Sequence, residues 1–303
     1  MNEESSPADR NTVMTDIIQA LEQRGYSIDG VACRTGRPDR SAFPVVSATG
    51  CRAIAKLYPK NNGQAAFENM QRLWCSDFGA QCKPPRMPKP IEYMPEASIL
   101  ITQRVDGQPL VEFPAIGTDV LRGSIALLVD LHRSDVQPMT RRTAKKLVRS
   151  VQRKAARIAE VAPRYTPAIS EVLQALERTK VGDTQLVPSH GDFSPRNILV
   201  GSSRLVLIDW DRLQWADPAR DVAYLGAWCW AASVRRGQAG DWEVLHHAVS
   251  AYAEMRPEAQ LKRQMGFHIA TGLVRIACSL VELWPEEAAV VPRLAAEALS
   301  SLA

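Results

Sequence analysis

Hydrophobic and polar residues follow one pattern in the first third of the chain and another in the rest, and the change falls near residue 103. Before it, short apolar runs between turn residues predict strands. A helix precedes them, beginning after Asn11 or Thr12 and stopping at Gly25, because apolar residues recur there at helical spacing. The expected strands cover residues 31–35, 43–47, 51–58, 91–94 and 98–102, and a further helix covers residues 63–74.

After this point, apolar residues recur mainly at three- and four-residue spacing, which is typical of helices packed on a core. Gly107 and Pro109 mark the turn where the composition changes. We therefore expect a β-rich N-terminal domain over residues 1–102 and a mainly helical domain over residues 103–303. The expected helices of the second domain cover residues 119–133 (with Thr118 as cap), 140–158, 168–176 and 221–232, with two or three more toward the C-terminus.

Composition narrows the class of protein. With 46% hydrophobic and 23% charged residues, the chain has the composition of a soluble globular protein. No run of eighteen apolar residues occurs, so we expect no membrane partner and a cytoplasmic location. The net charge of +4 is too small to indicate a nucleic-acid partner. None of the six cysteines forms a Cys-x-x-Cys pair, which argues against a zinc or disulfide framework. The oligomeric state stays open.

Polar residues in the stretch 188–226 carry the candidate chemistry. Residues 190–199 read His-Gly-Asp-Phe-Ser-Pro-Arg-Asn-Ile-Leu, and the apolar runs that follow predict a β-hairpin ending at Asp209. Asp192, in a tight loop, can accept a proton from a substrate hydroxyl, and the hairpin would direct Asn197 and Asp209 toward one magnesium ion. Phosphoryl transfer requires such convergence. Taken singly, each of these residues could equally cap a turn or close the hairpin, but the combination is far more specific.

Lys56 lies inside the apolar run of the third expected strand. A lysine at such a position usually faces solvent. The alternative is that Lys56 reaches nucleotide phosphates and pairs with Glu68, twelve residues later on the next expected helix. The loop between the first two expected strands, residues 36–42, contains one glycine and is a weak phosphate-binding signal.

These motifs, together with Asp-Pro-Ala-Arg-Asp-Val-Ala at residues 217–223, resemble the signature of the aminoglycoside phosphotransferase family. This family belongs to the protein-kinase-like small-molecule kinases, with choline and homoserine kinases as relatives. The resemblance implies an α+β, protein-kinase-like bilobal fold. The small N-lobe would hold a five-stranded antiparallel sheet and one main helix, and the larger C-lobe would be mainly helical. The resemblance also implies ATP or GTP as co-substrate, Mg²⁺ as cofactor and a small hydroxyl-bearing acceptor.

The resemblance assigns roles to residues of the central stretch. Asp192 would be the catalytic base, and Asn197 and Asp209 would be the magnesium ligands. His190 and Asp221 would hold the catalytic loop as structural supports and would not react.

Further roles are implied for the nucleotide. Lys56 would contact its phosphates and pair with Glu68. Gln103 and Val105, at the hinge between the lobes, would bind the nucleotide itself.

Three functions stay open on the sequence. They are an antibiotic-inactivating kinase, which we expect first, a metabolic kinase of a small alcohol such as choline, homoserine or a sugar, and a catalytically inactive nucleotide- or partner-binding protein. The joint presence of Lys56 and the three central site residues argues against the third. A polycationic aminoglycoside needs a carboxylate-lined pocket, whereas the helix expected over residues 140–158 carries eight basic residues. We expect that helix to present mainly a solvated face.

Overall fold

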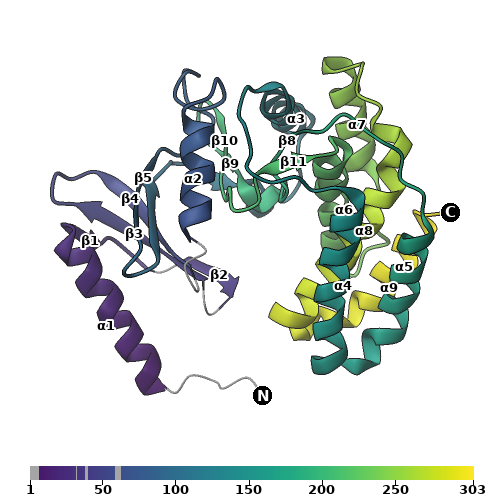
Figure 1. Cartoon of the computed structure of the whole chain (residues 1–303), viewed down its shortest axis with the longest axis horizontal. Helices are drawn as coiled ribbons and strands as arrows, with labels where there is room; N and C mark the ends of the chain where they lie inside the picture. Colours follow the sequence, from purple (N-terminus) through teal and green to yellow (C-terminus); the bar gives the residue numbers. More distant parts are fainter. Residues whose placement is uncertain (1–6, 32, 38–39, 59–62) are drawn as a thin grey trace. The chain divides into compact units, whose positions relative to one another are not determined.

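The computed structural model describes residues 7–31, 33–37, 40–58 and 63–303, and side chains from Thr15 onward outside residues 32–40. The chain divides into two compact units (Figure 1). The first consists of Met1–Trp74 and Pro88–Asp106, and the second of Cys75–Met87 and Gly107–Ala303. The chain therefore leaves the first unit once, at residues 75–87, before it returns. The domain boundary expected from the sequence lies after residue 102, without this excursion.

The first unit is built on an antiparallel sheet, six-stranded in the described residues, with the order β1-β3-β4-β6-β5 and β2 paired to β3. Five of these strands, β2 to β6, overlap the apolar runs from which strands were predicted. The expected five-stranded sheet is wrong by one edge strand, β1, which is three residues long with only Tyr26 buried and so leaves almost no pattern. The strands are β1 (Tyr26–Ile28), β2 (Cys33–Arg37), β3 (Arg40–Ser47), β4 (Arg52–Leu57), β5 (Pro90–Met94) and β6 (Ile99–Gln103).

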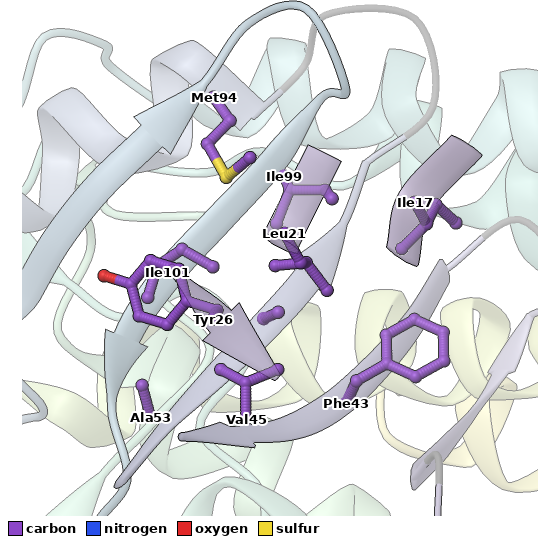
Figure 2. Packing of buried hydrophobic residues seen from close by; sticks show 10 residues of the cluster. Ile17, Leu21, Tyr26, Phe43, Val45, Ala53, Met94, Ile99 and Ile101 are labelled. Carbon is purple, nitrogen blue, oxygen red and sulfur yellow. The ribbon is translucent and has the colours of Figure 1, made fainter. Parts of the chain in front are cut away.

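Helix α1 (Pro7–Gln23) covers one face of this sheet. Figure 2 shows Ile17 and Leu21 of α1 against apolar side chains of the strands, among them Val45 and Ile101, which are fully buried. Because side chains alternate along a strand, residues 53, 55 and 57 of β4 face this cluster and Lys56 points to the opposite face. The second helix, α2 (Gly63–Trp74), packs against β5 and β6 and buries Ala66, Met70 and Leu73.

The second unit is mainly helical. Its longest helix, α8, packs against α4, α5, α6 and α9, and α3 packs against α7 (Figure 1). Residues 261–283, which include α8, are long and apolar enough to cross a membrane, but 72% of the most apolar window is buried inside the fold. That burial is typical of a core helix. The helices are α3 (Thr118–Arg133), α4 (Ala144–Val161), α5 (Thr166–Arg178), α6 (Ala219–Arg235), α7 (Glu243–Met255), α8 (Met265–Leu283) and α9 (Val291–Ser300).

Short strands in the second unit support the central stretch. The predicted hairpin forms between β9 (Ile198–Val200) and β10 (Leu205–Leu207), and β7 (Gln108–Pro109) pairs with β9. A second pair, β8 (Val187–Ser189) with β11 (Gln214–Ala216), was not expected from the sequence. Both pairs are antiparallel, and together they frame the loop that contains Asp192.

The two units match the expected fold class: an α+β, protein-kinase-like fold with a small β-rich N-lobe and a larger helical C-lobe. One local expectation is wrong. Thr118 is the first residue of α3, and Gly117 occupies the N-cap position without a side-chain hydrogen bond.

Candidate active site

The loop after β8 is held by the carboxylate of Asp221, on the first turn of α6. Its Oδ2 accepts a hydrogen bond from the backbone N–H of His190 at 2.8 Å, and its Oδ1 accepts one from Gly191 at 2.8 Å. Asp221 is fully buried. Burial alone would raise its pKa, but the hydrogen bond from His132 and the charge of Arg220 outweigh it and keep the pKa below the ordinary range. The loop is thus fixed by an ionised, buried acceptor.

His190 ties the loop to the neighbouring hairpin. Its Nδ1 accepts from the backbone N–H of Asp192 at 3.2 Å, so its Nε2 carries the proton and donates to the carbonyl of Ile208 at 3.0 Å. The ring lies 4.6 Å, centroid to centroid, from the buried ring of Trp210. Both ring nitrogens of His190 are therefore used in structural hydrogen bonds.

His132 supports the same carboxylate from α3. Its Nε2 lies 3.3 Å from Asp221 Oδ2, and its Nδ1 lies 2.7 Å from the hydroxyl of Tyr252. Burial lowers the pKa of His132, although Asp221 opposes the shift. His132 is a hydrogen-bonded core residue.

Asp192 sits in a strongly cationic environment. Its Oδ1 lies 2.6 Å from Nη2 of Arg275, and its Oδ2 lies 3.8 Å from Nε of Arg212. Burial would raise the pKa of Asp192, but the charges of these two arginines outweigh it and lower the pKa well below the ordinary range. The carboxylate is therefore ionised at neutral pH and is able to orient and accept a hydrogen bond from a hydroxyl.

Asn197 and Asp209 lie at the same end of the β9–β10 hairpin. The N–H of Ile208 donates to the carbonyl of Asn197 at 3.0 Å, which places Asp209 one residue from that pairing. The side-chain Nδ2 of Asn197 donates to the carbonyl of Asp192 at 2.9 Å. This bond directs the amide nitrogen toward the loop and leaves Oδ1 as the atom that can bind a metal.

The backbone of Asp209 has a φ of +68°, in the left-handed region that few side chains other than glycine adopt. Such strain persists where the surrounding structure imposes it, commonly at functional sites. The charge of Asp209 acts on both Arg212 and Arg275 and favours their charged forms, although Arg275 and burial lower the pKa of Arg212 overall. A carboxylate and an amide oxygen at one hairpin end fit the oxygen preference of Mg²⁺.

The predicted nucleotide residues lie in the first unit. Lys56 is on β4, with Nζ 4.8 Å from the ring centre of Tyr58, and Glu68 on α2 accepts a hydrogen bond from Gln64. Gln103 ends β6, and Val105 follows it in an extended connection. Residues 38–39 of the candidate phosphate loop fall outside the described residues, and Gly36 belongs to β2.

The structure thus brings five predicted residues together within the second unit: His190, Asp192, Asn197, Asp209 and Asp221. Sequence reasoning missed Arg275 and Arg212, which contact the predicted base. Arg275 left one signal: it is the only charged residue between His268 and Glu282 of α8. Two surface cavities, of about 380 and 390 Å³, lie along α4, α5 and α8, and none of the predicted site residues lines them.

A family model described as the phosphotransferase enzyme family matches residues 38–257, more than half of the chain. The chain belongs to this family. It is therefore a phosphotransferase whose acceptor is a hydroxyl group of a small molecule. No curated protein matches the sequence.

Solved structures of several kinases share the fold. The chain is similar to a choline kinase from Cryptosporidium parvum Iowa II, with a TM-score of 0.67, 13% identity and 95% of each chain covered. It is also similar to a thermostable mutant of the aminoglycoside phosphotransferase APH(4)-Ia, with a TM-score of 0.68, 15% identity, and 93% of this chain and 98% of that chain covered.

A third similar structure is the spectinomycin phosphotransferase APH(9)-Ia, in complex with ADP and spectinomycin. The TM-score is 0.57, the identity 15%, and the match covers 95% of this chain and 92% of that chain. At such low identities the likeness shows the fold alone. The bound ADP accords with nucleotide use by this family.

Proposed function

We propose that this protein is a magnesium-dependent kinase that transfers the γ-phosphate of ATP or GTP to a hydroxyl of a small molecule in the cytoplasm. The observation that carries the proposal is that Asp192 and Asn197 are held in one buried network, with Asp209 at the same end of the β9–β10 hairpin. Asp192 and Asn197 are linked through a hydrogen bond of 2.9 Å, and the loop that bears them is anchored by Asp221. In this proposal Asp192 orients the acceptor hydroxyl and takes its proton as the bond to phosphorus forms.

Mg²⁺ would be held by Asn197 Oδ1 and the carboxylate of Asp209, and when bound it would neutralise charge on the transferred phosphate. Lys56 and Glu68, with Gln103 and Val105, are proposed to bind the nucleotide. His190 and Asp221 act as positioning residues, since all their described hydrogen bonds are to the loop, the hairpin or a core histidine.

The acceptor we propose is the hydroxyl of an antibiotic, with a metabolic alcohol as the alternative. Similar solved structures include aminoglycoside, macrolide and spectinomycin phosphotransferases, which supports the first, and choline kinases, which support the second. Three acidic residues that could have contributed to a pocket for a polycation are engaged elsewhere. Asp217 contacts His268 at 3.5 Å, Glu282 contacts Arg157 at 3.7 Å, and Glu287 is paired with Arg235.

Replacement of the base tests the proposal. Asp192→Asn keeps the shape of the side chain and should reduce phosphate transfer by roughly 10²–10⁴-fold, the usual contribution of a general base. Nucleotide affinity should change little. Asp183→Asn, at an exposed position of the same unit, is the matched control. Transfer by Asp192→Asn within tenfold of the parent would contradict the assignment of the base.

The metal ligands need a separate readout. In Asp209→Asn, the affinity for ATP and GTP should fall in the presence of Mg²⁺ and stay unchanged in its absence, measured by calorimetric titration of both nucleotides. Equal affinities with and without Mg²⁺ in parent and variant would remove Asp209 from the metal site.

A further inference from the structure

Cationic side chains from several elements of the second unit converge on Asp192. Arg275 comes from α8 and Arg212 from the loop before β11. Lys154, on the inward side of α4, lies close to both arginines. Arg196 lies in the short 3₁₀ helix Pro195–Asn197, and its charge also lowers the pKa of Asp192. The side chain of Arg275 is 11% exposed and that of Arg212 is 38% exposed, so the group is reached from solvent through Arg212.

These cations lie close enough to affect each other. The charge of Arg275 is the largest influence that lowers the pKa of Arg212, ahead of burial. Burial, then Arg275 and Arg212, lowers the pKa of Lys154 to about 8. Mutual repulsion of this kind is unfavourable unless an anion shares the site.

Two of the arginines also have donors without a partner. Among the described residues, Nη1 of Arg220 and Nε of Arg196 are buried and donate to no hydrogen-bond acceptor. Arg220 is 7% exposed and its Nη2 donates to the carbonyl of Gly191 at 3.2 Å, the same carbonyl that Arg275 contacts at 2.8 Å. Unsatisfied buried donors beside the base point to a ligand with acceptor oxygens.

Carboxylates of the second unit do not neutralise this group fully. Asp221 is committed to the backbone of the catalytic loop, and Asp217 to His268 and the N–H of Ala219. Glu282 contacts the exposed Arg157. Two carboxylates, those of Asp192 and Asp209, therefore act on Arg275 and Arg212. Arg196 beside Asp192 and Lys154 beside the two arginines add further positive charge, so the cations outnumber these carboxylates.

We propose that the acceptor of this kinase is anionic: a hydroxyl compound that carries a carboxylate or phosphate group, bound by Arg275 and Arg212. The inference rests on the proposed kinase function and names its substrate class. A cationic alcohol would be repelled at this position. An anionic substituent would replace Asp192 as the partner of Arg275, and the carboxylate released from that ion pair would then contact the acceptor hydroxyl.

Calorimetric titration of the full chain, with and without saturating Mg²⁺ and ADP at constant ionic strength, tests the inference. The probes are glycerol 3-phosphate and malate as anionic alcohols, glycerol as the neutral and choline as the cationic alcohol. The anionic probes should bind at least about tenfold more tightly than the other two. A preference for phosphate or for carboxylate identifies which anion the site takes.

Variants separate the anion site from general charge effects. Arg275→Gln should weaken anion binding by roughly ten- to hundredfold, Arg275→Lys should retain part of the affinity, and Arg122→Gln, an exposed arginine of α3, should leave it unchanged. Arg212→Gln gives a second variant with a more exposed side chain if Arg275→Gln does not fold. Anion affinities equal to that of glycerol, or unaffected by both substitutions, overturn the inference.

Transfer of labelled γ-phosphate to the same four compounds distinguishes this inference from the proposed function. Phosphorylation of choline or glycerol but of neither anionic probe would keep the kinase and refute the anionic acceptor. Arg275-dependent binding of the anions without any nucleotide binding would support the anion site and refute the kinase.

Discussion

Asp221→Asn is the substitution whose effect follows most directly from the structure. Both oxygens of Asp221 accept a backbone N–H, Oδ2 from His190 and Oδ1 from Gly191, each at 2.8 Å. The amide NH₂ of asparagine must replace one of these oxygens. In either orientation a donor then faces a backbone donor, in a site that is fully buried.

The magnitude follows from the bond that is lost. A hydrogen bond to a charged group contributes about 1.5–3 kcal/mol, and a buried donor left without a partner costs about 1–3 kcal/mol. These contributions overlap, so we expect the free energy of unfolding to fall by about 2–4 kcal/mol. A folded domain has about 5–15 kcal/mol available, so the variant should still fold.

Urea unfolding, followed by tryptophan fluorescence, measures the change. The midpoint should move and the slope with denaturant should not, because the same surface is exposed on unfolding. Phosphate transfer should fall with it, since the loop that bears Asp192 loses an anchor. Asp241→Asn is the matched control, an exposed carboxylate that accepts one local N–H from Glu243, and it should change stability by less than about 0.5 kcal/mol. A shift in Asp221→Asn no larger than that of the control would refute the reasoning.

Three other outcomes are expected. Gly191→Ala should lower the melting temperature and reduce phosphate transfer more than tenfold. The φ of Gly191 is +74°, and a Cβ would lie 2.6 Å from the carbonyl of Arg212, so the substitution overpacks the loop. Parent-like activity would contradict this expectation. Tyr252→Phe should lower the free energy of unfolding by about 1–2 kcal/mol, since the hydroxyl that contacts His132 at 2.7 Å is lost. The pKa of Asp221 is lowered in the folded state, so its stabilising effect is complete above about pH 4 and is lost as the pH falls further. The difference in free energy of unfolding between the parent and Asp221→Asn should therefore become smaller in acid. A difference that is constant down to pH 2.5 would contradict this expectation.

Local patterns made the central hairpin predictable. Two apolar runs around Gly201-Ser202-Ser203 specify β9 and β10, and the register that places Ile208 opposite Asn197 follows from so short a turn. The helix from Gly63 to Trp74 was predicted with the bounds that the structure shows, because its buried residues repeat at helical spacing.

Long-range contacts were not predictable in the same way. β8 and β11 are three residues each, too short for a period, and Pro188 lies within β8. The pairing of Arg275 with Asp192 joins residues from elements that are distant in the sequence. Local patterns in a single sequence do not reveal such a contact. In the basic helix α4, the local pattern predicted correctly that most of the cationic side chains are exposed. It did not predict that Lys154 turns inward toward Arg275.

The excursion of the chain at Cys75–Met87 has a consequence for synthesis on the ribosome. Phe78 and Met87 are buried within the second unit, and Phe78 meets Trp210 edge to face at 5.6 Å. Trp210 emerges more than a hundred residues after Phe78. The first unit can fold once residues 88–106 have been synthesised. Until Trp210 has been synthesised, however, Phe78 in the segment Cys75–Met87 stays exposed, and the segment is accessible to chaperones and proteases. A chain that stalls before residue 210 would therefore contain a folded first unit with an exposed apolar segment. A gene fragment that begins at Gly107 would lack the residues that cover Trp210.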